Sequence, residues 1–106
     1  MLFAFSIAPA TTPDPDGSMS AAVARAVCII NDSGLPHETT AMFTTIEGEW
    51  DQVMPVVKAA CDAVLEVSPR VSLVLKADLR PGHTGELTGK VERLNAAITE
   101  LEGHGA

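Results

Sequence analysis

The segment Thr44–Trp50, with the sequence TTIEGEW, marks a change from strand-like to helical periodicity in the middle of the chain. β-Branched residues dominate before Gly48, which favours a strand. From Trp50 onward the apolar residues recur at helical spacing instead. These are Trp50, Val53, Val57, Ala60, Cys61 and Val64. The segment therefore predicts the end of a strand followed directly by an amphipathic helix.

The two acids of this segment, Glu47 and Glu49, are separated by Gly48, which breaks the geometry that a paired catalytic dyad needs. Glu49 and Asp51 are interpreted as acids at the positive end of the helix dipole. Pro55 is compatible with a helix that begins around Asp51, because first-turn amides have no partner within the helix. Glu47 closes the strand and stays a candidate for recognition chemistry.

The N-terminal part predicts a strand, a loop and a helix. Residues 2–8 alternate, with Phe3, Phe5 and Ile7 on one face and Leu2, Ala4 and Ser6 on the other. Residues 9–18 contain three prolines and a glycine, which is typical of a loop. A helix then starts near Ser18 or Ser20 and ends near Asp32, before Gly34 and Pro36. Its predicted inner stripe consists of Val23, Ala26, Val27 and Ile30.

Residues 37–48 predict two short strands, HETTAM and FTTIEG, with a turn near Met42 and Phe43; a single bent strand is the alternative. Residues 70–80 alternate as a clear strand, and residues 81–85 form a turn. A last helix is expected over residues 86–102, weakened by Gly89, and residues 103–106 should fray. The apolar stripe of that helix is Leu87, Val91, Leu94, Ile98 and Leu101.

The resulting order predicts an α+β protein with the ferredoxin-like βαββαβ arrangement, an antiparallel four-stranded sheet and an extra C-terminal helix. At 106 residues, residues 1–106 are expected to form a single domain. Two helices would cover one face of the sheet. The other face mixes apolar and polar side chains and predicts an interface with a second copy. It carries Leu2, Ala4, Ser6, Val74, Lys76 and Asp78.

Composition excludes several classes of function. Seven basic and 14 acidic residues give a net charge of −7, which disfavours nucleic acid and anionic membranes as partners. The apolar N-terminus has no basic region typical of a signal peptide, and no run is long enough to span a membrane, so a cytoplasmic location is expected. Cys28 and Cys61 are interpreted as small core residues in a reducing compartment, with a disulfide as the alternative. The three histidines lack metal-ligand spacing, and no metal or cofactor is expected.

A resemblance to a known family rests on three stretches. SGLPHETTAMFTTIEGEWDQVM (33–54), FSIAP (5–9) and VSLVLKADLR (71–80) resemble the thiamine-binding protein family, formerly of unknown function and related to YkoF-type proteins. The match is specific at SGLP, at IEGEWD and at Lys76-Ala77-Asp78-Leu79-Arg80. The chain departs from the family where Ala41-Met42-Phe43-Thr44 replaces Pro-Met-Gly-Thr. Phe43 in place of glycine alters the turn and the shape of any pocket there.

The resemblance implies a ferredoxin-like subunit that forms dimers and tetramers. It also implies a pocket at the subunit interface for thiamine or its hydroxymethylpyrimidine part, and no catalysis. An oligomeric regulatory or scaffold protein without a small-molecule ligand is the alternative, and an enzyme acting on a small heterocycle is the third hypothesis. The candidate ligand-binding residues are Ser6, Thr40, Met42, Thr44, Glu47, Lys76 and Asp78.

Several of these candidates also have an interpretation as packing or interface residues that contact no ligand. Ser6 also serves as a small residue that permits close packing of the sheet, and Glu47 as a structural or interface acid. Lys76 and Asp78 share a face of one strand and are equally interpreted as a pair at a subunit interface. Thr44 aligns with the family threonine after the turn, but a regular strand would point it to the face opposite Glu47.

Overall fold

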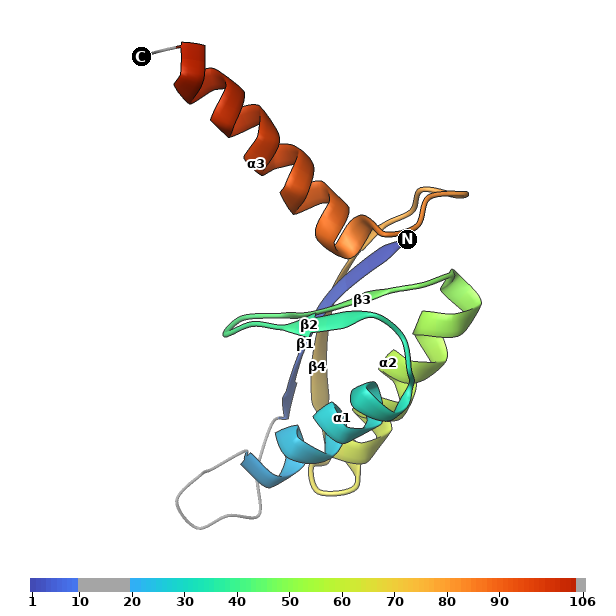
Figure 1. Cartoon of the computed structure of the whole chain (residues 1–106). Coiled ribbons are helices and arrows are strands. Elements are labelled where there is room, and N and C mark those ends of the chain that lie inside the picture. The colour runs from blue at the N-terminus through green and yellow to red at the C-terminus, as the bar shows by residue number, and fades with distance from the viewer. Residues whose placement is uncertain (10–19, 105–106) are drawn as a thin grey trace.

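The computed structural model describes residues 1–9 and 20–104 and has the predicted α+β architecture (Figure 1). One four-stranded antiparallel sheet, with strand order β2-β3-β1-β4, carries α1 and α2 on one face. The elements in chain order are β1 (Leu2–Pro9), α1 (Ser20–Asp32), β2 (His37–Thr39), β3 (Thr44–Glu47), α2 (Trp50–Leu65), β4 (Val71–Asp78) and α3 (Glu86–His104). The ferredoxin-like order with an extra C-terminal helix is confirmed. Residues 10–18 of the expected loop lie outside the described residues.

The strand register assigns every sheet residue to a face. On β1, Phe3 pairs with Ala77 and Phe5 with Leu75, whereas Ala4 pairs with Lys76. Phe3 and Phe5 are buried beneath the helices, and Ala4 lies on the opposite, open face. The period-2 alternation of both strands therefore predicted the two faces correctly.

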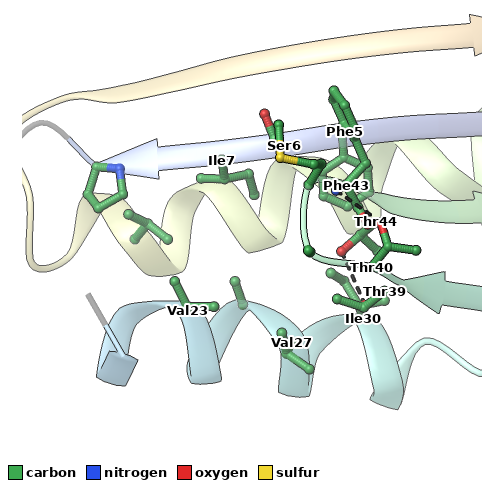
Figure 2. A pocket seen from close by; sticks show the side chains of 15 residues that line it. Phe5, Ser6, Ile7, Val23, Val27, Ile30, Thr39, Thr40, Phe43 and Thr44 are labelled. Carbon is green, nitrogen blue, oxygen red and sulfur yellow. Dashed lines mark hydrogen bonds between the residues drawn. The ribbon is translucent and has the colours of Figure 1, made fainter. Parts of the chain in front are cut away.

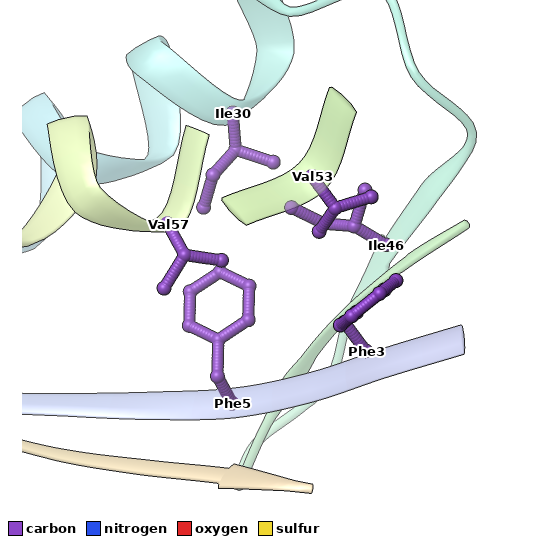
Figure 3. Packing of buried hydrophobic residues seen from close by; sticks show 6 residues of the cluster. All are labelled: Phe3, Phe5, Ile30, Ile46, Val53 and Val57. Atoms are coloured by element: carbon purple, nitrogen blue, oxygen red, sulfur yellow. The ribbon is translucent and has the colours of Figure 1, made fainter. Parts of the chain in front are cut away.

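The core lies between the sheet and the two helices and is made mainly of aliphatic side chains around two phenylalanines (Figure 3). Its buried members are Phe3, Phe5, Ile30, Ile46, Val53 and Val57. Small residues allow α1 and α2 to approach closely in a second cluster, which contains Ala22, Ala26, Ala60 and Val64. Trp50 packs edge-on against Phe3, with ring centroids 5.9 Å apart, so it extends the core at the start of α2.

The hairpin and the start of α2 differ in detail from the prediction. Two strands are present, as expected, but β2 ends at Thr39, and the Thr40 N–H donates to the Phe43 carbonyl at 2.8 Å across the turn. The helix begins at Trp50, where the Gln52 side chain accepts a hydrogen bond from the Glu49 N–H at 3.0 Å. Pro55 thus lies in the second turn, and the first-turn explanation for its tolerance was wrong. Without an N–H it cannot bond to the carbonyl four residues earlier.

The prediction that Cys28 is a core residue was also wrong. The inward residues of α1 are Ala22, Ala26 and Ile30, and Cys28 follows Ala26 by two residues, about 200° around the helix. It is consequently exposed. Cys61 on α2 is half-buried, and both thiols are free. Burial is the main cause that raises the pKa of the Cys61 thiol, with a smaller contribution from Asp62.

The last helix starts on the open side of the sheet and runs away from the body of the molecule (Figure 1). It ends later than predicted, at His104 instead of residue 102. Residues 105–106 lie outside the described part of the chain. The direction of α3 leaves most of the open face uncovered by residues 1–9 and 20–104 of the same chain.

Candidate functional site

A hollow opens where β1 continues beyond Thr44, the first residue of β3 (Figure 2). The pairing of β3 with β1 stops at Phe5, whereas β1 continues to Pro9. The space beyond is bounded by α1 on one side and by the β2–β3 turn on the other, and its volume is about 210 Å³. The difference in length between the two neighbouring strands therefore creates the concavity.

Four of the seven predicted ligand-binding residues line this hollow: Ser6, Thr40, Met42 and Thr44. They come from β1, the turn and the first position of β3, and the hairpin brings them together. Met42 is 74% exposed at the tip of the turn. The fold thus brings together residues up to 38 positions apart in the sequence.

Threonine hydroxyls form the polar part of the hollow. The Oγ1 atoms of Thr39 and Thr44 lie 3.2 Å apart across the hairpin, and the Thr40 hydroxyl donates to the Phe43 carbonyl at 3.1 Å. These bonds hold the hydroxyls in fixed positions. Their remaining donor and acceptor capacity can serve a ligand without reorganisation of the turn.

The apolar part of the hollow comes from α1 and two phenylalanines. Val23, Val27 and Ile30 face it from α1, Phe5 lies at its base, and Phe43 forms one wall with 39% of its surface exposed (Figure 2). Val23 was predicted to be core and instead lies open to this space. None of the described residues that line the hollow carries a charge, so it is suited to a neutral ring system.

Glu47 lies outside this hollow, and its carboxylate caps α3. One oxygen accepts the backbone N–H of Glu86 at 2.7 Å and the other accepts that of Leu87 at 3.4 Å. Only 7% of Glu47 is exposed. An ionised carboxylate at the first free amides of a helix satisfies them and the positive end of the dipole together. In this chain, Glu47 therefore anchors the last helix to the sheet.

Lys76 and Asp78 also lie outside the hollow, on the open face. Asp78 forms an ion pair with Lys90 of α3. This hydrogen-bonded ammonium is the main cause that lowers the pKa of the Asp78 carboxyl, with smaller effects from Arg80 and Lys76. Lys76 lies opposite Ala4 and is exposed. Asp78 thus has its ion-pair partner on α3, which the sequence analysis did not anticipate.

The first turn of α3 contains another charged group. Glu86 is 5% exposed, and its carboxylate accepts a hydrogen bond from Arg93 at 2.6 Å. That bond is the main cause that lowers the pKa of Glu86.

Within residues 1–9 and 20–104, no cluster of three or more potential ligands could hold a metal ion. No helix in the same ranges is long and apolar enough to cross a bilayer.

Comparison with known proteins gives consistent results. Residues 3–95 match the model of the family described as thiamine-binding protein. A UPF0045 protein of Mycobacterium bovis is 47% identical over 103 residues, covering 96% of this chain and 98% of the relative. A UPF0045 protein of Synechocystis is 32% identical over 71 residues, covering 66% of this chain and 59% of the relative.

Two solved structures share the fold. A hypothetical protein of Methanocaldococcus jannascii superposes with a TM-score of 0.77 at 29% identity, over 89% of this chain and 94% of the other. A Thermotoga maritima protein, assigned provisionally to thiamine biosynthesis or salvage, gives a TM-score of 0.71 at 28% identity, over 88% and 96% of the two chains. Together with the family match over residues 3–95, these likenesses show that the chain belongs to the thiamine-binding protein family.

Proposed function

We propose that this protein binds thiamine or a related hydroxymethylpyrimidine compound without transforming it, at the hollow beside β1, as a homo-oligomer. The observation that carries the proposal is the convergence of Ser6, Thr40, Met42 and Thr44 on one uncharged hollow in a member of this family. Hydroxyl groups and an aromatic wall in one small cavity are typical of sites for small heterocycles.

The size and charge of the hollow favour the pyrimidine half of the ligand. Its volume of about 210 Å³ is below the ~300 Å³ at which pockets for drug-sized molecules begin. A single ring is therefore the natural occupant. The aminopyrimidine is neutral and offers both donors and acceptors to the threonine hydroxyls, while Phe43 can pack against its face. The cationic thiazolium ring would extend toward the opening.

Self-association is part of the proposal because the hollow is open and the free sheet face is mixed in polarity. A neighbouring subunit would complete the wall that a molecule of the size of thiamine needs. Glu47, Lys76 and Asp78 would meet a ligand only if the open face of such a neighbour approached the hollow. Within one chain, Glu47 and Asp78 are engaged by α3.

The absence of catalysis is supported by the chemistry of the lining. The described residues around the hollow include no histidine, cysteine, lysine or carboxylate. Serine and threonine hydroxyls without a neighbouring base are weak nucleophiles. Binding alone is therefore the function that these side chains support.

An exposed free thiol at Cys28 accords with a reducing cytoplasm.

Isothermal titration with thiamine, hydroxymethylpyrimidine and a hydroxyethylthiazole control tests the proposal. We expect saturable binding of the first two ligands only. Thr44→Val should weaken binding about tenfold through loss of one hydrogen bond. Thr45→Val is the matched control, because Thr45 pairs with Ala4 and faces the open side. No binding of thiamine or the pyrimidine by the folded protein would reject the proposal and leave the scaffold alternative.

A further inference from the structure

The edge of β1 beside the hollow lacks a neighbouring strand. Pairing with β3 ends where Phe5 meets Thr44, whereas pairing with β4 on the other side continues to Pro9. Among the described residues, no strand covers the hollow side of β1 from Ser6 onward. Peptide N–H and C=O groups at such an edge have no partner within the sheet, so they are available to a molecule in the hollow.

The strand register identifies which peptide groups point toward the hollow. In an antiparallel pair, alternate residues direct both their N–H and their C=O groups toward the same neighbouring strand. The Gly48 N–H donates to the Met1 carbonyl at 3.1 Å, so Met1 and every second residue after it direct these groups toward β3. Phe5, opposite Thr44, is the last of this series to meet β3. The next residue of the series is Ile7, which lines the hollow.

Two further observations support this assignment. The Glu47 N–H donates to the Pro36 carbonyl at 2.9 Å, so Glu47 faces β2 and Thr44, three positions before it, faces β1. Pro9 is the residue of β1 that follows Ile7 on the hollow side. A proline has no N–H, and it is tolerated in a strand where that group would meet no neighbouring strand. Ile7 therefore presents both a donor and an acceptor to the hollow.

We propose that the main chain of Ile7 selects the ligand, and that the hollow takes planar heterocycles with an acceptor nitrogen beside an amino group. The N–H of Ile7 donates to the ring nitrogen, and its C=O accepts from the amino group. The two bonds run in the same direction, as the two bonds between facing strand residues do. This inference rests on the proposed function, because the aminopyrimidine of thiamine carries such an edge. The threonine hydroxyls remain available for the other polar groups of the ligand.

The shape and charge of the hollow favour a neutral heterocycle over an extended peptide as the occupant. The turn that contains Met42 and Phe43 lies where a continuation of β3 would have to pass (Figure 2). Apolar side chains of α1 and of the turn, among them Val27 and Phe43, suit the faces of a flat ring. The described lining residues carry no charge. A charged group would therefore lose its hydration there without a compensating partner.

Isothermal titration with edited pyrimidines tests the assignment from the ligand side. The parent ligand is hydroxymethylpyrimidine, in which the amino group lies beside one of the two ring nitrogens. Replacing the amino group by hydrogen, or the adjacent ring nitrogen by CH, removes one bond and should weaken binding about tenfold. Replacing the other ring nitrogen by CH keeps the edge and is the matched control, which should retain the parent affinity. Equal affinities across the series would overturn the proposal.

Ile7→Pro tests the same contact from the protein side, because proline removes the N–H and keeps the carbonyl. Ile7→Ala is the reference variant, since it loses the isoleucine side chain but retains the N–H. We expect Ile7→Pro to bind hydroxymethylpyrimidine about tenfold more weakly than Ile7→Ala. Equal affinity of the two variants would contradict the main-chain contact.

Far-UV circular dichroism and thermal unfolding show whether both variants fold. Ile7→Pro should fold, because the N–H that it loses faces no strand. Unfolding of Ile7→Pro but not of Ile7→Ala would indicate that this N–H bonds within the sheet, and the proposal would then fail.

Cytosine separates this inference from the proposed function, because it has an amino group beside a ring nitrogen but is not a part of thiamine. Binding of cytosine without binding of thiamine or hydroxymethylpyrimidine would reject the proposed function and support the main-chain contact. Binding of thiamine that is insensitive to edits of the edge would support the proposed function and reject the main-chain contact. If the folded protein binds none of these ligands, both are rejected.

Discussion

Removal of the Glu47 carboxylate should loosen α3 while leaving the rest of the fold intact. Glu47→Ala deletes the acceptor for the N–H groups of Glu86 and Leu87, which lie 2.7 and 3.4 Å from its oxygens. Hydrogen bonds to a charged group contribute about 1.5–3 kcal/mol, and loss of a helix cap costs about 1 kcal/mol. Because both bonds act at one helix end, we expect a combined loss of about 2 kcal/mol. That is about a 30-fold change in the local opening equilibrium.

Amide hydrogen exchange, read by mass spectrometry of peptides from α3, measures this change directly. The cap at Glu86 and Leu87 and the ion pair of Lys90 hold the N-terminal part of α3 to the body. Amide exchange should therefore accelerate in α3 and stay unchanged in peptides containing Ile46 or Val57. Glu47→Gln keeps an acceptor without the charge and should show about half the effect. Glu38→Ala, on the same sheet face one strand away, is the control.

The opposite result would refute the capping argument. If α3 exchanges at the parent rate in Glu47→Ala while thiamine affinity falls, then Glu47 is a ligand contact and not the anchor of the helix. The two roles therefore separate in a single variant, because one is read from exchange in α3 and the other from titration.

Two further predictions concern the core and the acid stability of the α3 anchor. Ile46→Ala removes a side chain with no exposed surface and should lower the free energy of unfolding, measured in urea, by about 3 kcal/mol. Val74→Ala is the control, because Val74 is 56% exposed and its truncation should change the free energy of unfolding by less than about 0.5 kcal/mol. The pKa values of Asp78 and Glu86 are lowered from their ordinary values of 3.8 and 4.5. Their stabilising effect is therefore complete above those values and is lost as the pH falls through the lower folded values. An acid titration followed by circular dichroism should show helix loss in that range, reduced in Lys90→Met; identical profiles would contradict the role of the ion pair.

The sheet and its two faces were predictable because they depend on local periodicity. The alternation around Phe3 and Phe5, and again around Leu75, assigns each residue to a face without knowledge of its partner strand. The Glu47 cap was not predictable, because the groups it joins are 39 residues apart and α3 shows no local acceptor for its first amides. The ion pair between Asp78 and Lys90 was not predicted from the sequence for the same reason.

The hollow was predictable only in part. Ser6, Thr40, Met42 and Thr44 were predicted as ligand contacts, yet nothing in these residues indicates that the pairing of β1 with β3 stops at Phe5 while β1 continues to Pro9. That difference in strand length creates the concavity. The contributions of Val23 and Val27 were missed because both fit a buried helical stripe equally well. Periodicity distinguishes the inner side of a helix from the outer side, but not a packed core from an open pocket.

Phe43 lines the hollow at a position where the family resemblance implies a glycine. Its replacement tests whether the aromatic ring helps or hinders binding. The ring forms a wall and stays 39% exposed, so it lines the space without filling it. Packing of an aromatic ring against a heterocycle contributes about 0.5–1.5 kcal/mol. Phe43→Gly should therefore weaken binding of the pyrimidine about fivefold, with little change in unfolding free energy. Phe43→Ala, which removes the ring without the added backbone freedom of glycine, controls for hairpin flexibility. Tighter binding by Phe43→Gly would mean that the ring obstructs the site and that a glycine at this position gives the more open pocket.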